Sequence, residues 1–259
     1  MITFIILCYN QEDTIKSAIE SVILSGITHE IIVLDNGSTD NSISIIEKMD
    51  CKLIKVNAFK NKSKARNIGI KMAKENYIRF LDGDDYFDEI NLKKEIEYMI
   101  ENNIKDDLIF TKHLTIYNGL MFHKNYEVNS FGGIANYYVK KDFLIQNKIF
   151  FDEEKFFYFF DDSFFYSHLF LNAKTINKDL LNDNFFHSYV CIKKEKTSSD
   201  LMVLSTEEII EYGSLIEDFV NYLKKNFCNK NDVITKEIKS ICEKYITYYY
   251  GELKRRFYD

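Results

Sequence analysis

The sequence contains no proline among its 259 residues, and it has only four arginines against thirty lysines. No stretch rich in glycine, serine or proline interrupts it, and it shows no internal repeat or low-complexity tract. These absences argue against a repeat protein and against two domains joined by a flexible linker. They favour one large domain followed by a helical appendage.

The five cysteines include no C-x-x-C pair, and their odd number leaves one without a disulfide partner. This pattern predicts reduced thiols in a cytosolic protein. The apolar segment Met1–Leu7 contains no basic residue, and polar residues follow it closely. We therefore expect a strand there rather than a signal peptide, and no apolar run reaches the length of a membrane span.

Hydrophobic residues make up 46% of the sequence and aromatic residues 15%, which is enough to fill a substantial core. The formal net charge is −6, and the acidic residues are dispersed along the chain. A protein that binds nucleic acid over much of its surface would be basic instead. We therefore expect no nucleic-acid partner.

Apolar runs and helical periods alternate through the first hundred residues. The runs predict strands at Phe4–Leu7, Glu30–Leu34, 52–56 and Tyr77–Leu81. Helices are expected between them, the last over Ser63–Lys74. Such alternation predicts an α/β fold with a mainly parallel sheet, right-handed crossovers and helices on the faces of the sheet.

The pattern is looser after residue 85. It predicts helices at Ile90–Asn102 and Lys141–Gln146, a strand or hairpin arm over Leu108–Tyr117, and a strand over Phe185–Ile192. From about Ser205 onward the periodicity is helical.

Polar side chains follow three of the predicted parallel strands, which share one carboxyl edge. Tyr9 follows the first strand, Asp35 ends the second, and Asp82, Asp84 and Asp85 follow the fourth. Crowded carboxylates repel one another, so a divalent metal is expected there. Since ligands bind at the carboxyl ends of such strands, we expect a phosphate-bearing substrate held through Mg²⁺ or Mn²⁺. A solvated turn that caps the next helix is the alternative for the acids.

Four segments resemble the family 2 glycosyltransferases of the GT-A fold: Ile5–Asn10, Val33–Ser42, Ala65–Gly69 and Phe80–Asp85. Their order and spacing match over about the first ninety residues. The resemblance implies an inverting hexosyl- or N-acetylhexosaminyltransferase that uses a nucleotide-diphosphate sugar, commonly a UDP-sugar. It also implies Mn²⁺ or Mg²⁺ at the D-x-D motif and a glycan or lipid-linked acceptor.

The resemblance also assigns roles to individual residues. It implies that Tyr9, Asp35 and Arg66 line the base pocket and that Asp82 faces the ribose or the sugar. Asp84 would ligate the metal, with Asp82 as a possible second ligand. For Asn36–Asp40, a turn that caps the next helix explains most of the residues without a ligand.

An acidic pair before an aromatic-rich helix carries the general base in this family, and Asp161–Asp162 fits that pattern. The resemblance therefore nominates Asp162 as the base, with Asp161 in support. Asp85 is expected to support the role of Asp82 or that of Asp84. The alternative is that the two acids only cap a helix beginning near Ser163.

A histidine and two lysines near residue 190 complete the candidates. The resemblance implies that His187 could reach the metal, and that Lys193 and Lys194 belong to a basic loop over the diphosphate. The alternatives are a histidine packed in the core and a solvated lysine-rich loop.

Three positions depart from the family pattern. Leu7 stands where proline is usual, Asp161 replaces the commoner glutamate, and His168 stands where arginine often follows the acidic pair. The departures at Leu7 and His168 motivate the alternative of a non-catalytic nucleotide-sugar or glycan-binding module. A dinucleotide-dependent oxidoreductase is excluded, because no G-x-G-x-x-G follows the first strand.

The predicted organisation is a catalytic domain over 1–200, with a nucleotide-sugar-binding half over 1–105 and an acceptor-binding half over 106–200, and a helical segment over 201–259. The basic and aromatic residues of Lys254–Tyr258 suggest peripheral association with anionic lipid at the inner face of the membrane. Packing on the catalytic domain and pairing in a homodimer are the alternatives. By analogy with the family, we expect a bacterial enzyme that builds polysaccharide or lipid-linked glycan.

Overall fold

The computed structural model describes residues 1–56, 61–117, 120–124, 134–154, 161–182, 188–193 and 206–227, together with Glu243 and Thr247. The chain forms two compact units, Met1–Lys193 and Lys194–Asp259. The predicted boundary after residue 200, and the predicted halves of the first domain, remain predictions.

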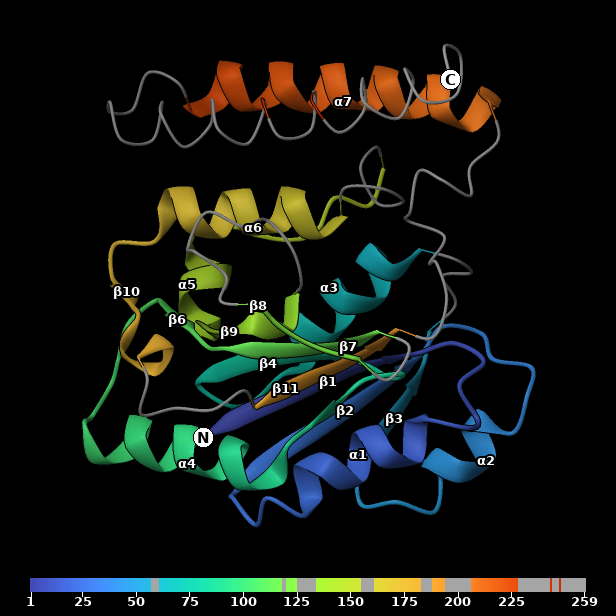
Figure 1. Ribbon diagram of the computed structural model, residues 1–259, viewed down its shortest axis with the longest axis vertical. Coiled ribbons are helices and arrows are strands. Elements are labelled where there is room, and N and C mark those ends of the chain that lie inside the picture. Colours follow the sequence, from blue (N-terminus) through green and yellow to red (C-terminus); the bar gives the residue numbers. More distant parts are fainter. Residues whose placement is uncertain are drawn as a thin grey trace. The chain divides into compact units, whose positions relative to one another are not determined.

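A seven-stranded sheet forms the centre of the first unit, in the order β10-β6-β9-β4-β1-β2-β3 (Figure 1). Its strands are β1 (Ile2–Cys8), β2 (His29–Asp35), β3 (Lys52–Lys55), β4 (Tyr77–Asp82), β6 (Leu108–Phe110), β9 (Tyr137–Lys140) and β10 (Ile176–Asn177). Strand β9 is antiparallel to both of its neighbours, and the other pairs are parallel. The predicted mainly parallel sheet is therefore confirmed.

Helices cover both faces of this sheet, as predicted. They are α1 (Ile15–Ile23), α2 (Ser42–Ile46), α3 (Lys62–Met72), α4 (Glu89–Glu101), α5 (Lys141–Gln146) and α6 (Asp161–Asn172), with the 3-10 helices η1 (Ile134–Asn136) and η2 (Asp179–Leu181). Figure 1 shows α1, α2 and α4 on one face and α3, α5 and α6 on the other. Apolar residues at helical spacing, such as Ile15, Ala18, Ile19 and Val22 of α1, form the buried faces.

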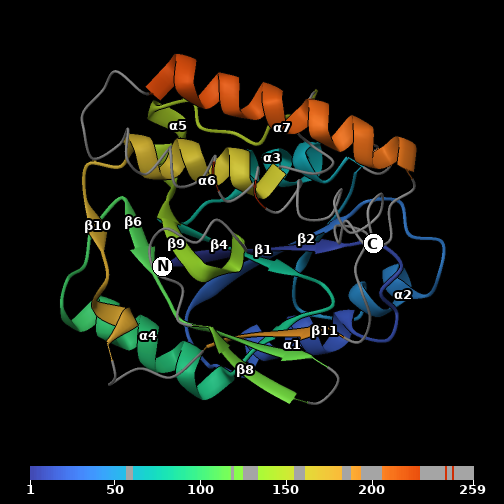
Figure 2. The same ribbon diagram turned by 45° about the horizontal axis from the view of Figure 1, so that its top comes forward.

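A second, four-stranded sheet has the order β5-β11-β7-β8. Its strands are β5 (Tyr86–Phe87), β7 (His113–Tyr117), β8 (Leu120–Lys124) and β11 (Tyr189–Lys193). Figure 2 shows β11 and β8 on the side of the large sheet that carries α1.

The segment Leu108–Tyr117, predicted as a strand or hairpin arm, forms two strands, because it supplies β6 to the large sheet and β7 to the small one. A hairpin arm is confirmed for β7, which pairs antiparallel with β8, whereas a single strand over the whole segment is wrong. The chain leaves the large sheet at Thr111, whose backbone N–H donates to the Asn136 carbonyl and whose hydroxyl accepts from Arg79. Three polar residues, Thr111-Lys112-His113, separate two apolar arms at this bend. Such a short polar interruption is compatible with one strand as well as with two, so the sequence pattern by itself does not place the arms in different sheets.

Arg79 of β4 connects the two sheets, although it is fully buried. It donates to Glu95 of α4 at 2.8 Å and to Ser188, just before β11, at 2.8 Å. Its guanidinium carbon lies 4.5 Å from the ring centre of Phe87 and 4.4 Å from that of Tyr138. The charge is thus paired, hydrogen-bonded and placed between two aromatic rings.

Helix α3 lies close to the sheet because Gly69 has no side chain. A Cβ atom there would lie 2.8 Å from Ile5 Cγ2 and 3.0 Å from Leu34 Cδ1. The close packing seats the helix against β1 and β2. Arg66, one turn nearer the start of the helix, is held near the carboxyl edge of the sheet.

The second unit contains α7 (Thr206–Phe227), which confirms the helix predicted from about Ser205. Ile216, Phe219, Val220 and Leu223 recur at helical spacing and are buried. The basic segment Lys254–Tyr258 lies outside the described residues. No described helix combines the length and the apolar character that crossing a lipid bilayer requires.

Candidate functional site

Two carboxylates lie on either side of the end of β1. In the parallel register, Leu7 of β1 is opposite Asp82 of β4, and Cys8 is opposite Asp35 of β2. The Gly83 N–H donates to the Leu7 carbonyl at 2.9 Å, which continues the pairing one residue past β4. The predicted shared edge of the strand ends is therefore confirmed.

The loops after β1 and β2 are joined by hydrogen bonds. Asn10 N–H donates to Ser38 Oγ at 2.9 Å, Thr39 N–H to Asn10 Oδ1 at 2.8 Å, and Glu12 N–H to Asp40 Oδ2 at 3.0 Å. Asn10 has a φ of 50°, a conformation that asparagine tolerates better than most residues. These bonds make the two loops one ordered rim beside the strand ends.

Asp35 stabilises this rim through hydrogen bonds to its backbone. Its carboxylate is 2% exposed and accepts from the backbone N–H groups of Gly37 at 3.2 Å and Ser38 at 3.3 Å. The side chain of Tyr9, by contrast, is 40% exposed at the end of β1. The base contacts expected of both residues remain predictions.

Arg66 joins the end of β4 to the start of α6. Its guanidinium is 3% exposed and donates to Asp82 at 3.0 Å, to Asp161 at 2.5 Å and to Asp162 at 3.1 Å. Burial acts to lower the pKa of Arg66, but the three carboxylates outweigh it and raise that pKa above its ordinary value. Arg66, Asp82, Asp161 and Asp162, which were expected to have separate roles, therefore form one ion-pair cluster, the Arg66 cluster.

The residue after Arg66 fixes the segment that packs against α6. Asn67 donates to the Phe151 carbonyl and accepts from the Phe151 N–H, both at 2.9 Å, and it also donates to Glu153 at 2.8 Å. The ring of Phe151 stacks on Phe165 of α6 with centroids 3.9 Å apart. The Arg66-Asn67 pair therefore positions α6 by its charge and through this packed segment.

Asp162 is the more exposed member of the acidic pair, with 37% side-chain exposure against 11% for Asp161. Desolvation, then repulsion from Asp161, raises the pKa of Asp162 to about 7, although Arg66 acts to lower it. A carboxylate with a pKa near neutrality is suited to accept a proton from a substrate. Both acids also lie in the first turn of α6, where negative charge is favoured.

The turn after β4 is held closely against the end of β1. The Asp85 N–H donates to the Asp82 carbonyl at 3.0 Å and closes the turn. A Cβ atom on Gly83 would lie 2.2 Å from Gln11 Oε1 and 2.8 Å from the Leu7 carbonyl oxygen, so the turn requires glycine.

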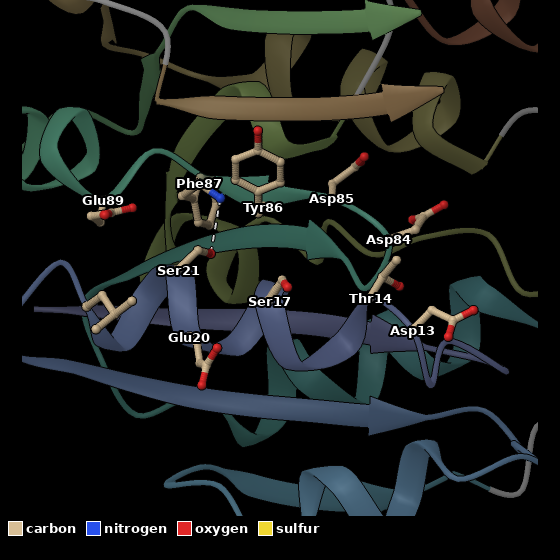
Figure 3. Close-up of a pocket in the computed structure, with 11 residues that line it drawn as sticks. Asp13, Thr14, Ser17, Glu20, Ser21, Asp84, Asp85, Tyr86, Phe87 and Glu89 are labelled. Carbon is tan, nitrogen blue, oxygen red and sulfur yellow. Dashed lines mark hydrogen bonds between the residues drawn. The ribbon is translucent and has the colours of Figure 1, made fainter. Parts of the chain in front are cut away.

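Asp84 is the exposed acid of this turn and lines a cleft of about 360 Å³. The cleft runs between α1 and β5 (Figure 3). Its other lining residues are Asp13, Thr14, Ser17, Glu20, Ser21, Leu24, Asp85, Tyr86, Phe87 and Glu89.

Within the described part of the chain, no three His, Cys, Asp or Glu side chains converge to hold a metal ion. Asp82 is paired with Arg66, and Asp85 accepts a hydrogen bond from the Tyr189 hydroxyl. Mg²⁺ is commonly bound through one or two carboxylates together with substrate phosphates. Asp84, a hard oxygen donor on an open cleft, fits that arrangement.

The structure does not test the candidate residues near position 190. His187 and Lys194 fall outside the described residues, and for Lys193 only the backbone at the end of β11 is described. Their predicted roles remain predictions. Tyr189, which contacts Asp85, was not among the candidates, because a single sequence contains no signal for a contact across 104 positions.

Comparison with known families gives a match to the model for glycosyl transferase family 2 over residues 3–181. The matched part contains β1–β4, the turn Asp82–Asp85 (the acidic turn) and the acidic pair Asp161–Asp162. The chain is 32% identical over 149 residues to the Escherichia coli UDP-Glc:alpha-D-GlcNAc-diphosphoundecaprenol beta-1,3-glucosyltransferase WfaP, covering 56% of this chain and 49% of WfaP. It is 36% identical over 106 residues to a Staphylococcus aureus poly-beta-1,6-N-acetyl-D-glucosamine synthase, covering 39% and 25%. The chain matches about half the length or less of these relatives.

Solved structures show the same fold. Staphylococcus aureus TarS in complex with UDP-GlcNAc superposes with a TM-score of 0.74 at 19% identity, covering 98% of this chain and 74% of that one. The mannosyltransferase PcManGT from Pyrobaculum calidifontis, in complex with GDP-Man and Mn²⁺, gives a TM-score of 0.61 at 12% identity, covering 98% and 74%. The predicted GT-A type of α/β fold is confirmed.

Proposed function

Because the chain belongs to glycosyl transferase family 2, we propose that it transfers a sugar from a nucleotide-diphosphate donor to a glycan or lipid-linked acceptor with inversion. The observation that carries this proposal is the Arg66 cluster. It joins the acidic turn at the end of β4 to Asp162 through one buried guanidinium. A donor-binding turn and a proton acceptor are thereby held in contact.

A UDP-sugar is the proposed donor. TarS was solved with UDP-GlcNAc and with UDP, and WfaP is named for UDP-Glc. In this chain the exposed ring of Tyr9 would stack on the base, with Asp35 and the rim that it shapes beside it. Arg66 is proposed to act by holding Asp82 toward the ribose or sugar.

The donor diphosphate is proposed to bind with Mn²⁺ or Mg²⁺ at Asp84, with Asp82 as the possible second ligand. When bound, the metal supplies a positive charge that offsets the charge of the leaving diphosphate. Asp85 supports the turn by accepting from Tyr189. The neighbour PcManGT was solved with Mn²⁺, which supports this choice of cofactor.

Asp162 is the proposed general base. The acceptor hydroxyl oxygen attacks the anomeric carbon, its proton passes to Asp162, and the carbon–oxygen bond to the diphosphate breaks with its electron pair on the leaving group. General-base assistance of this kind contributes about 10²- to 10⁴-fold in rate. Asp161, buried and paired with Arg66, holds the start of α6 in place.

The proposed acceptor is a lipid-linked or growing glycan, presented at the inner face of the membrane. WfaP is named for a diphosphoundecaprenol acceptor, and the Staphylococcus aureus relative for synthesis of a polysaccharide. A non-catalytic binding module on the same fold is the competing function. The intact acidic turn and the Arg66 cluster favour the enzyme.

Thermal unfolding with UDP, GDP and CMP, each with and without Mn²⁺, tests the donor site. A ligand at about 100 times its dissociation constant stabilises the folded state by about 2.7 kcal/mol. A rise in Tm with UDP that requires Mn²⁺ is expected. A rise with GDP or CMP instead would change the donor, and no rise with any nucleotide would count against the transferase.

Sugar transfer itself needs a second experiment. Incubation with UDP-sugars and a lipid-diphosphate-linked acceptor should release UDP, and the release should depend on the acceptor. Binding of UDP without any release across such donors and acceptors would favour the binding module.

A further inference from the structure

Strand β11 contacts the acidic turn through the hydroxyl group of Tyr189, which donates to Asp85 Oδ2. Asp85 is 5% exposed and Tyr189 is 6% exposed. Burial, together with the charge of Asp85, raises the pKa of the Tyr189 hydroxyl well above its ordinary value. The hydroxyl therefore remains a donor at neutral pH, and a hydrogen bond to a buried carboxylate is stronger than a neutral one.

The position of Tyr189 is itself fixed by several contacts. Tyr189 pairs with Phe87 in the antiparallel β5–β11 ladder. The preceding Ser188 accepts from the Asp88 N–H at its carbonyl, at 2.7 Å, and from the buried Arg79 at its hydroxyl, at 2.8 Å. Tyr189 thus presents its hydroxyl from a rigid support.

The other end of the turn is held by β1, through the bond from Gly83 to Leu7 and the lack of space around Gly83. Asp84 lies between these two anchors, with its side chain on the cleft (Figure 3). Loss of one anchor would free the turn to move by small backbone rotations. The direction of the Asp84 carboxylate depends on that backbone.

We propose that Tyr189 is a positioning residue for the donor site, holding Asp85 so that the carboxylate of Asp84 is directed to the metal of the donor diphosphate. This inference rests on the proposed function, because it concerns the same metal-dependent site. It assigns Asp85 to the support of the turn rather than to direct coordination. In this role Tyr189 would act through Asp85 and not by direct contact with substrate or metal.

The test compares Tyr189→Phe with Tyr77→Phe. Tyr77 begins β4 at the end opposite the acidic turn, and its hydroxyl donates to the Asp106 carbonyl at 2.9 Å. Each variant therefore removes one hydroxyl hydrogen bond from a buried tyrosine. Mn²⁺ affinity at saturating UDP, measured by the electron paramagnetic resonance of free Mn²⁺, is the readout, with Tm recorded for both variants.

We expect Tyr189→Phe to weaken Mn²⁺ binding by about tenfold, the effect of one hydrogen bond to a charged group. Tyr77→Phe should bind Mn²⁺ within about twofold of the wild type, whatever its Tm. Equal Mn²⁺ affinity of Tyr189→Phe and the wild type would overturn the positioning role alone. A wild-type protein that binds no Mn²⁺ with UDP would overturn the proposed donor site and this inference together.

A second pair of variants keeps the inference testable if Tyr189→Phe does not fold. Asp85→Asn retains an oxygen that can accept from Tyr189, whereas Asp84→Asn removes the proposed ligand charge. The positioning role predicts a smaller loss of Mn²⁺ affinity for Asp85→Asn than for Asp84→Asn. Equal losses would identify Asp85 as a direct ligand and overturn the inference.

Discussion

At the scale of single residues, one cation pairs with three carboxylates at the centre of the candidate site. Arg66 contacts Asp82, Asp161 and Asp162 in a planar fork that a lysine ammonium cannot reproduce. The cluster retains excess negative charge. Desolvation, and then repulsion from Asp161, explain why Asp162 holds a proton more tightly than usual.

Arg66→Lys should therefore lower kcat by about 10²-fold, the scale expected when a catalytic group is misplaced by about 1 Å. It should also lower the free energy of unfolding by about 1–3 kcal/mol, since buried hydrogen bonds to carboxylates are lost. Kinetics and urea unfolding measure the two effects. Lys64→Arg, on the exposed side of α3, is the matched control. Full activity in Arg66→Lys would contradict the positioning of both carboxylates by the fork.

Because Asp84 and Asp162 have different proposed roles, replacing each of them should affect nucleotide binding differently. Asp84→Asn should abolish turnover and weaken metal-dependent nucleotide binding, because the ligand charge is lost. Asp162→Asn should abolish turnover while nucleotide binding stays near the wild-type level. Turnover assays and calorimetric titration with UDP and Mn²⁺ separate these outcomes. If Asp162→Asn retains most of its activity, Asp162 is not the base.

The raised pKa of Asp162 predicts that both kcat/KM and the stability of the folded protein depend on pH. As the proposed base, Asp162 would have to be ionised, so kcat/KM should rise with pH and level off above about 7. The folded protein holds this proton more tightly than the unfolded chain, in which the pKa is near 3.8. The contribution of Asp162 to stability is therefore fully present below about 4 and is lost as pH rises to about 7.

Urea unfolding of the wild type and of Asp162→Asn across this range checks the second effect. The stability of the wild type relative to the variant should fall as pH rises from about 4 to about 7. A relative stability that rises over that range would mean that the pKa of Asp162 is lowered in the folded state.

At the scale of elements, the position of α3 depends on the absence of a side chain at Gly69. Replacement by alanine would improve helix propensity by about 1 kcal/mol, but overpacking usually costs about 1–3 kcal/mol. Because the new methyl group would contact Ile5 and Leu34, the cost of overpacking should exceed the gain in helix propensity. We expect Gly69→Ala to lower the free energy of unfolding, as measured in urea, and to lower kcat because Arg66 moves with the helix. A more stable Gly69→Ala variant would show that α3 has room to move.

The elements of the first hundred residues were the most predictable from the sequence. Strands β1, β2 and β4 are apolar runs buried on both faces, and their boundaries differ from prediction by at most two residues. The short strands β5 and β10 have two residues each and no pattern of their own. They exist because partner strands pair with them, which no local pattern encodes.

At the scale of the whole molecule, the buried Arg79 network joins β4, α4 and β11. Arg79→Met would leave Glu95 buried without its cation, and breaking such a pair costs about 3–5 kcal/mol. The double variant Arg79→Met, Glu95→Met should recover part of this loss, since both charges are gone. Urea unfolding of the single and double variants measures the coupling. A double variant less stable than Arg79→Met would contradict this account.

The sequence by itself determined the alternating α/β pattern, the shared edge of the parallel strands and the family, because these depend on local periodicity and on motifs within the first ninety residues. Only the tertiary structure decided that Arg66 pairs with Asp161 across 95 positions and that Tyr189 holds Asp85 across 104. Such contacts form when packing brings distant elements together. A buried arginine and a buried tyrosine then bond with the carboxylates that burial places within reach.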